Sequence, residues 1–287
     1  MTAIPVAPSP QRHERRVAEL VATASIEMAP HDRLIGGGLR DLFPPGTTVF
    51  VNHPSSADHH AIVTACAKLR QAGFEPVPHI AARRLAGVED AVDFLRRATD
   101  EAEITDVLLI GGDPDWPAGP FRDSLALLAS GILESHGIER IRFAGYPEGH
   151  PQISTAALDR ALDAKLALAR ERGLRAALVT QFGFEPAPIE AWIAGLRGRG
   201  IDCPVAIGIA GPARAATLVK FGVRCGIGSS LRALARGHTA FARVLTDAGP
   251  DALIDALVAQ SAAIDALHIF TFGGVTRTAG WRRRKLA

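Results

Sequence analysis

The sequence predicts a single α/β domain built as a closed (βα)8, or TIM, barrel, and three observations carry that prediction. Eight short β-rich runs recur along the 287 residues, and helix-like segments separate most of them. Several of these runs, such as DVLLI and PVAIGI, are apolar without alternation, which is typical of parallel strands buried on both faces. The chain is also close in length to one such barrel, which takes roughly 250 residues.

The predicted strands are apolar or β-branched runs bounded by residues that favour turns. In chain order they cover residues 23–30, 47–54, 75–82, 106–113, 140–147, 176–184, 204–211 and 266–274. Since the runs are evenly spaced and similar in length, we expect each to contribute one strand to the same sheet.

Helical spacing of apolar residues predicts the segments between the strands. The expected helices cover residues 15–22, 57–72, 88–98, 121–136, 155–172, 188–196, 211–221, 230–248 and 250–262. The interval between the seventh and eighth strands is the longest, so we expect one extra helix or more before the last strand. Residues 1–20 form a lead and a short helix, with the first 12 or so flexible, and residues 21–287 form the barrel.

The charge balance gives little support for a nucleic-acid partner. The net charge is +2, and the 32 basic residues are spread along the chain. The one dense basic run, residues 282–285 in WRRRKLA, is interpreted as a solvated tail in preference to a nucleic-acid contact. Apolar helices around a barrel often pair, so a homo-oligomer is possible.

Cysteine use and hydropathy point to a cytoplasmic protein. Cys66, Cys203 and Cys225 cannot all pair with each other and show no metal-ligand spacing, which fits reduced thiols. The N-terminus lacks an uninterrupted apolar stretch, and nothing approaches the ~20 apolar residues of a membrane span. We therefore expect no membrane partner. Because no His, Cys or carboxylate group has metal-ligand spacing, we also expect no metal.

Polar residues with catalytic potential follow the predicted strands. In a β/α barrel the active site is built from what lies at the C-terminal end of each strand. The residues in such positions are Glu27, His53, His79, Asp113, Tyr146, His150 and Gln181. We expect them to share one pocket, and above all we expect Glu27 and Asp113 to face the same cavity.

Glu27 lies inside the apolar first strand, between Ile26 and Met28. An unpaired carboxylate is costly to bury there, and in a partly dehydrated pocket its pKa should rise. A raised pKa suits a general acid near neutral pH. A structural carboxylate paired with an arginine or with the backbone is an equally good interpretation of this residue alone.

The segment GGDPDWPAG follows the fourth strand and contains Gly111, Gly112 and Asp113. The two glycines let the backbone approach a planar ligand closely. Taken alone, the segment is better explained as a turn, because Gly, Asp and Pro dominate turns. The Gln181 amide after the sixth strand can both donate and accept hydrogen bonds to a ligand edge, or can be satisfied within the core.

Other candidates carry weaker signals. Tyr146 and His150 lie in the stiff loop AGYPEGHP, His79 is a modest candidate for a ligand contact, and His53 a weaker one. The segment GIGSS at residues 226–230 could cradle a phosphate, although a simple helix cap explains it better. His59 and His60 are expected to begin an exposed helix. Neither a nucleophile elbow nor a GxGxxG after a strand is present.

Six segments in order resemble the methylenetetrahydrofolate reductases. SIEMAP resembles the SFEFFPP opening of that family, VPHIAA its PHLTC and LLIGGDP its LRGDPP. AGYPEGHP is almost verbatim, VTQFGF looks like ITQ-F-F, and HIFTF looks like the start of HFYTLNR. The resemblance covers residues 24–272 and is confined to the catalytic barrel of the family.

This resemblance implies reduction of 5,10-methylenetetrahydrofolate to 5-methyltetrahydrofolate, or the reverse, in one-carbon metabolism. NADH or NADPH would be the donor and FAD the hydride carrier. Glu27 would protonate the bridging folate nitrogen, Asp113 would contact the pterin and the flavin, and Gln181 would bind the pterin. The implied cofactor contacts also include Asn52, His79, Gly111, Gly112, Tyr146, His150 and Lys165.

The chain departs from the family pattern at two places. Gly111 stands where the family has an arginine near the flavin diphosphate, and Gly273 and Gly274 replace an Asn-Arg pair, for which Arg277 is the expected substitute. Two alternatives therefore stay open. One is a flavin-free enzyme that passes hydride from the nicotinamide directly to the folate, and the other is a non-catalytic folate-binding subunit.

Overall fold

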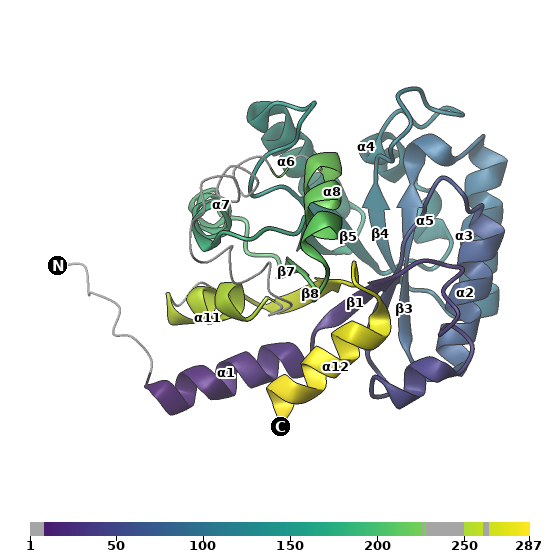
Figure 1. Ribbon diagram of the computed structural model, residues 1–287. Coiled ribbons are helices and arrows are strands. Elements are labelled where there is room, and N and C mark those ends of the chain that lie inside the picture. The colour runs from purple at the N-terminus through teal and green to yellow at the C-terminus, as the bar shows by residue number, and fades with distance from the viewer. Residues whose placement is uncertain (1–8, 226, 228–249, 261–263) are drawn as a thin grey trace. The chain divides into compact units, whose positions relative to one another are not determined.

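The computed structural model describes residues 9–225, 227, 250–260 and 264–287. Eight strands close into a barrel in the order β1-β2-β3-β4-β5-β6-β7-β8 (Figure 1). The strands are β1 Ser25–Met28, β2 Thr48–Val51, β3 Glu75–Ala81, β4 Asp106–Ile110, β5 Arg140–Gly145, β6 Arg175–Thr180, β7 Val205–Ala210 and β8 Ala266–Phe270. The predicted (βα)8 barrel is therefore confirmed, and each strand lies inside its expected run except β6, which begins one residue earlier at Arg175.

The chain forms two compact units, which are described separately below. The first contains residues 25–144 and 155–179, and the second contains residues 1–24, 145–154 and 180–287. Strands β1 to β5 thus belong to the first unit, apart from the last residue of β5, and β7 and β8 belong to the second.

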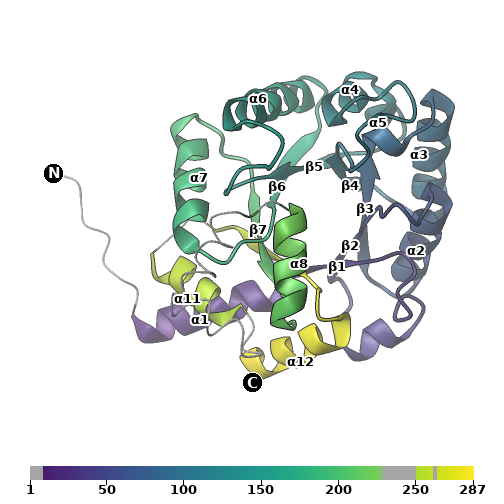
Figure 2. The same cartoon turned by 45° about the horizontal axis from the view of Figure 1, so that its top comes forward.

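The helices alternate with the strands along the chain. Their bounds are α1 Pro10–Ala22, α2 His59–Gln71, α3 Val88–Ala102, α4 Ser124–Ala129, α5 Ile132–Ser135, α6 Thr155–Glu171, α7 Pro186–Gly198, α8 Ala215–Cys225, α11 Asp251–Ala259 and α12 Val275–Leu286. Two short 3-10 helices, η1 Gly38–Asp41 and η2 Ala82–Arg84, add to these. Figure 2 shows α2 and α3 on the outer side of β2 and β3.

The strand register in the first unit separates an apolar face from a polar one. Neighbouring parallel strands place Ile26 beside Val49 on one face and Glu27 beside Phe50 on the other. Residues of the first face are buried and apolar: Ile26, Val49, Val51, Ile80, Val107 and Leu109. The alternate positions include Glu27, Phe50, His79 and Arg142. Because the apolar face packs under the helices, the polar face points into the barrel.

Helices α2 and α3 cover the outer face of this unit. Asp58 caps α2 by accepting a hydrogen bond from the Ala61 backbone N–H. The buried stripe of α2 is Ile62, Val63, Ala65, Cys66 and Leu69, and that of α3 is Ala91, Phe94, Leu95, Ala98 and Ala102. Burial raises the pKa of the Cys66 thiol, so this cysteine behaves as an inert apolar group.

Two helix predictions need correction. The single helix expected over residues 121–136 is in fact α4 and α5, because Gly131 between them adopts a left-handed conformation with φ of 76°. Helix α1 begins at Pro10, inside the segment expected to be flexible. Proline is well suited to the first turn of a helix, where its missing N–H has no partner to lose.

The basic C-terminal run is part of a helix rather than a tail. Trp281 in α12 is buried, and its indole N–H donates to Asp251 of α11 at 2.8 Å. Lys285 forms an ion pair with the same carboxylate at 2.9 Å, and Arg282 donates to the Ala22 carbonyl at the end of α1. These contacts dock α12 onto its neighbours within the second unit.

The long interval before β8 contains α8 and α11, which agrees with the expected extra helix. The helix expected over residues 230–248 and the GIGSS segment, apart from Ile227, lie outside the described residues. Within the described part of the chain, no helix has both the length and the apolar character needed to cross a bilayer.

Candidate active site

Glu27 lies on the inward face of β1, in contact with two polar side chains, one just past the end of β2 and one in β3. Only 16% of its side chain is exposed, and its Oε2 lies 3.6 Å from His79 Nε2. The Asn52 side-chain amide donates a hydrogen bond to Glu27 Oε1 at 3.2 Å. The C-terminal halves of β1, β2 and β3 thus bring together three residues that the sequence proposed separately.

The strand ladder explains this arrangement. The Asn52 backbone N–H bonds to the Met28 carbonyl at 3.0 Å, which carries the β1–β2 pairing one residue past the end of β2. His79 lies within β3, and its ring meets the edge of Phe50 with centroids 6.0 Å apart. The position of each side chain therefore follows from register and alternation rather than from loop conformation.

Phe50 lies between His79 and a half-buried arginine, Arg142. The Arg142 guanidinium lies 5.2 Å from the centre of the Phe50 ring, and it also binds Asp106 at 2.8 Å. The charge of Arg142 is thereby matched by a carboxylate near the N-terminal end of β4. For Glu27, the contacts seen are to an amide and an imidazole.

Asn52 offers an acceptor to a ligand. Its Oδ1 atom is buried, and no described residue donates a hydrogen bond to it. A buried amide oxygen without a donor is costly, so a ligand N–H at this position would stabilise the complex. Heterocycles with ring or exocyclic N–H groups, such as a pterin or a flavin, have donors suited to this oxygen.

Asp113 lies near the start of the loop that leaves β4, where it meets Arg84 from η2. The distance from Arg84 Nη2 to Asp113 Oδ2 is 3.9 Å, and 70% of the Asp113 side chain is exposed. Among the contacts described above, Asp113 meets Arg84, whereas Glu27 meets Asn52 and His79. That the two carboxylates face a common cavity stays a prediction.

The two glycines before Asp113 differ in their surroundings. Gly112 has φ of 93°, and a Cβ there would lie 3.1 Å from Ala81 Cβ, so the turn needs a glycine. A Cβ on Gly111 would meet no heavy atom of the described residues within 4 Å. The backbone at Gly111 is therefore open to close approach by a flat ligand.

His53 contacts the end of β3 and a ring of α3, although the sequence marked it as only a weak candidate. Its Nδ1 accepts a hydrogen bond from the Ala81 N–H at 3.4 Å, and its ring meets the edge of Phe94. Burial, followed by the nearby Arg84 and His79 charges, lowers the pKa of His53 to about 4. The imidazole is therefore neutral at pH 7 and carries its proton on Nε2.

In the second unit, the loops after β5 and β6 hold the remaining candidates. Tyr146 and His150 pack edge to face, with ring centroids 5.3 Å apart. The Gln181 backbone N–H bonds to the Gly145 carbonyl, and its side-chain oxygen accepts from the Phe182 N–H at 3.1 Å. The side-chain amide N–H groups of Gln181 are the atoms suited to donating hydrogen bonds to a ligand.

Lys165 and Arg277 lie on helices. The Lys165 ammonium is 5.1 Å from the centre of the Phe143 ring, and burial lowers its pKa. Phe143 and Arg142 lie on opposite faces of β5. Phe143 therefore points away from the polar face of the strand. Arg277 is exposed in the first turn of α12. The roles proposed for these two residues stay predictions.

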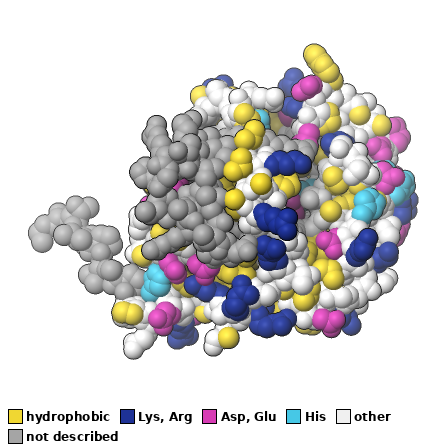
Figure 3. Space-filling model, in the orientation of Figure 1, with side chains coloured by type: hydrophobic (Ala, Val, Ile, Leu, Met, Phe, Trp, Pro, Cys, Tyr) yellow, Lys and Arg dark blue, Asp and Glu magenta, His cyan; other side chains and the backbone are white. Residues whose placement is uncertain are grey.

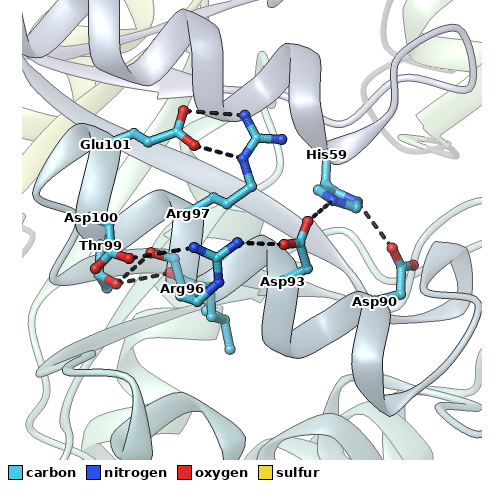
Figure 4. A network of polar contacts seen from close by, with 9 residues as sticks. His59, Asp90, Asp93, Arg96, Arg97, Thr99, Asp100 and Glu101 are labelled. Atoms are coloured by element: carbon cyan, nitrogen blue, oxygen red, sulfur yellow. Dashed lines mark hydrogen bonds and ion pairs between the residues drawn. The ribbon is translucent and has the colours of Figure 1, made fainter.

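A polar network on the outer surface joins α2 to α3 (Figure 4). His59 contacts Asp90 through Nδ1 and Asp93 through Nε2, each at 3.0 Å, and Arg96 donates to Asp93. Ligand atoms of His59, His60 and Asp93 lie within 4.8 Å of one another. This cluster was not predictable from the sequence, since it depends on how two helices pack. Figure 3 shows histidine beside acidic side chains on this side of the molecule.

A half-open cavity of about 370 Å³ lies between the loop after β1 and α2. Its polar lining is His31, Asp32, Thr64 and Lys68. The cavity is formed by residues that the sequence did not single out.

No protein-family model matches this chain. The fold is one that hosts many enzyme activities, with ligands bound at the C-terminal ends of the strands. Arg84 is the clearest residue that sequence reasoning missed. The only signal for it was an Arg-Arg pair directly after the third strand.

Proposed function

We propose that this protein is a folate-dependent oxidoreductase that interconverts 5,10-methylenetetrahydrofolate and 5-methyltetrahydrofolate with NADH or NADPH. The resemblance of six ordered segments motivates the proposal. The observation that carries it is the placement of Glu27 on the inward face of β1, held by Asn52 and near His79.

Glu27 supplies the proton in this scheme. Its carboxyl group protonates the bridging nitrogen of the substrate, the carbon–nitrogen bond of the five-membered ring breaks, and the cationic methylene carbon then accepts a hydride. One proton and one hydride are thus added, and a methyl group results. A general acid of this kind contributes about 10²- to 10⁴-fold to the rate.

Asn52 and His79 position the acid. The Asn52 amide N–H fixes one carboxyl oxygen, which leaves the orientation of the other to be set by His79. A hydrogen bond from Asn52 and a close contact with His79 restrict the carboxyl group more than either alone, and an oriented acid loses less entropy when the substrate arrives. The buried Asn52 oxygen is available to a ring N–H of the ligand.

FAD is the proposed hydride carrier, since a flavin accepts hydride from a nicotinamide and passes it to a folate. The open backbone at Gly111 and the acceptor oxygen of Asn52 fit a flat heterocycle. His79, Gly112, Tyr146 and His150 are the other proposed contacts. Asp113 and Gln181 are proposed to bind the pterin.

Direct hydride transfer without a flavin is a second enzymatic possibility. It is favoured by Gly111, which offers no cation to the flavin diphosphate, and by the position of Lys165 against Phe143. A folate-binding subunit without catalysis is less well supported, because binding alone does not require a carboxyl group oriented by two neighbours.

An anaerobic assay of the purified protein tests the proposal. The protein is mixed with methylenetetrahydrofolate and either nicotinamide, with and without added FAD, and the products are separated by chromatography. Formation of 5-methyltetrahydrofolate only with FAD supports the flavin enzyme, and formation without FAD supports direct transfer. Folate binding without any turnover would leave only the binding subunit.

A further inference from the structure

Two adjacent arginines after β3 differ in their contacts. Arg83 joins η2 to the loop after β4: its backbone N–H bonds to the Gly111 carbonyl, and its side chain donates to the carbonyls of Arg122 and Pro114. Arg84 donates no hydrogen bond to any described residue, and its one ion pair is the 3.9 Å contact with Asp113. Arg83 therefore holds the structure together, whereas Arg84 does not.

The position of Arg84 is unfavourable without a further partner. Only 17% of its side chain is exposed, so the guanidinium is partly shielded from water. The Asp113 carboxylate opposite is largely exposed and lies at the outer limit of an ion pair. A guanidinium that is desolvated in this way lowers stability unless an anion hydrogen-bonds to it.

His53 supplies a second donor in the same region. It is held by the Ala81 backbone at the end of β3, three residues before Arg84. Since Nδ1 accepts that hydrogen bond, the proton is on Nε2, for which no described residue serves as an acceptor. A neutral imidazole N–H beside a guanidinium is a suitable pair of donors for an oxyanion, as both point partial or full positive charge at it.

We propose that Arg84 and His53 form an oxyanion subsite at the C-terminal ends of β2 and β3, which binds a phosphate or carboxylate group of a ligand. The loop after β4 stands against this subsite, because the Ala118 N–H bonds to the Arg83 carbonyl. Asp113 sets the resting position of Arg84, and the bound anion displaces that carboxylate.

The identity of the ligand that carries the anion rests on the proposed function. Under that function the oxyanion is either a diphosphate, from the nicotinamide dinucleotide or from FAD, or a carboxylate of the folate glutamate. The subsite itself does not depend on the reaction, because it follows from the unsatisfied donors of Arg84 and His53.

Inorganic pyrophosphate is the probe for the subsite. Its affinity is measured by titration calorimetry at constant ionic strength for the wild-type protein and for Arg84→Gln, Arg84→Lys and His53→Ala. We expect Arg84→Gln to weaken binding about tenfold or more and Arg84→Lys to retain part of it. Arg122→Gln is the matched control, since that side chain is 85% exposed, and it should bind as the wild type does.

Thermal unfolding separates a binding role from a structural one. Arg84→Gln should unfold at the same temperature as the wild type or higher, because it removes a desolvated charge. A wild-type protein that does not bind pyrophosphate, or an Arg84→Gln protein that binds it equally well, would overturn the proposal. The proposal would also be overturned if Arg84→Gln unfolded at so low a temperature that loss of the fold explained the lost binding.

Competition identifies the source of the anion. NADH, NADPH, FAD and 5-methyltetrahydrofolate are each titrated against bound pyrophosphate. The ligand that displaces it, and whose own affinity falls in Arg84→Gln, provides the oxyanion. If pyrophosphate binds through Arg84 and none of the four competes, the subsite stands and the proposed function loses support.

Discussion

Glu27 Oε2 lies 3.6 Å from His79 Nε2, and the two residues come from strands that are separated by β2 in the sheet. The contact spans β2 because the Glu27 side chain reaches over the inward face of that strand, where Asn52 also contacts it. A carboxyl group in this position is oriented by the sheet itself, the most rigid part of the barrel.

Replacing the carboxyl of Glu27 tests the proposed acid. Glu27→Gln keeps the shape of the side chain but cannot supply a proton, so we expect folate reduction to fall by at least about 10²-fold. Reduction of added flavin by the nicotinamide, followed by absorbance, should continue. Glu139→Gln is the control. Glu139 directly precedes β5, is 62% exposed and forms an ion pair with Arg175. Full folate reductase activity in Glu27→Gln would exclude the assignment.

Asp113 is expected to act on the folate step. Asp113→Asn removes a charge beside the proposed pterin position, and we expect kcat for folate reduction to fall while the fold is unchanged, since the side chain is largely exposed. Steady-state kinetics with varied folate measures this. Asp115→Asn, two residues along the same exposed loop, is the control. Equal kinetics for both variants would remove Asp113 from the site.

His53 should make stability depend on pH. Its pKa is lowered to about 4 in the folded protein and is near 6.5 when unfolded, so between these values the unfolded chain binds more protons. The free energy of unfolding should therefore fall as the pH is lowered from 7 to 5, by about 1–2 kcal/mol from this residue. Urea unfolding at both pH values measures the change.

The control for that experiment is His53→Gln, which should lose this part of the pH dependence. Arg84→Gln should raise the pKa of His53, because a nearby positive charge is removed, although burial keeps it below its usual value. Titration of the His53 imidazole by NMR, in the wild type and in Arg84→Gln, separates the effect of burial from that of the Arg84 charge. A His53 signal that titrates near 6.5 in the wild type would contradict the burial argument.

Lys165 can be tested as either a phosphate contact or a packing residue. Because its ammonium lies over Phe143 and its pKa is lowered by burial, we expect Lys165→Met to keep flavin affinity and to be as stable as the wild type or more so. Fluorescence quenching of FAD and thermal unfolding measure the two quantities. A loss of flavin affinity with unchanged stability would instead place Lys165 at the cofactor.

The fold was predictable because its signals are local. Runs such as DVLLI and PVAIGI identify buried parallel strands without any knowledge of their neighbours. The break at Gly131 was missed because a glycine inside an apolar helical pattern is compatible with a continuous helix. Helix α12 was missed because its run of basic residues resembles a solvated tail. The contact of Trp281 with Asp251, which docks the helix, depends on tertiary packing.

The site was predictable only in part. Glu27 and His79 stand out in sequence, since a charged or polar residue inside an apolar strand needs a reason. Their contact with each other depends on strand register, and the different contacts of Arg83 and Arg84 depend on how η2 packs against the loop after β4. These contacts are set by tertiary packing, and no single segment of the sequence determines them.

The alternation along β1 to β4 has a consequence for how this protein can change. Ile26 and Val49 are buried on the face that packs under the helices, whereas Glu27 and Phe50 directly follow them in the chain and lie on the other face. A substitution on the inward face can therefore alter the chemistry of the site while the adjacent outward residue keeps the helices packed. The same barrel can thus support a different reaction without loss of the framework that holds it.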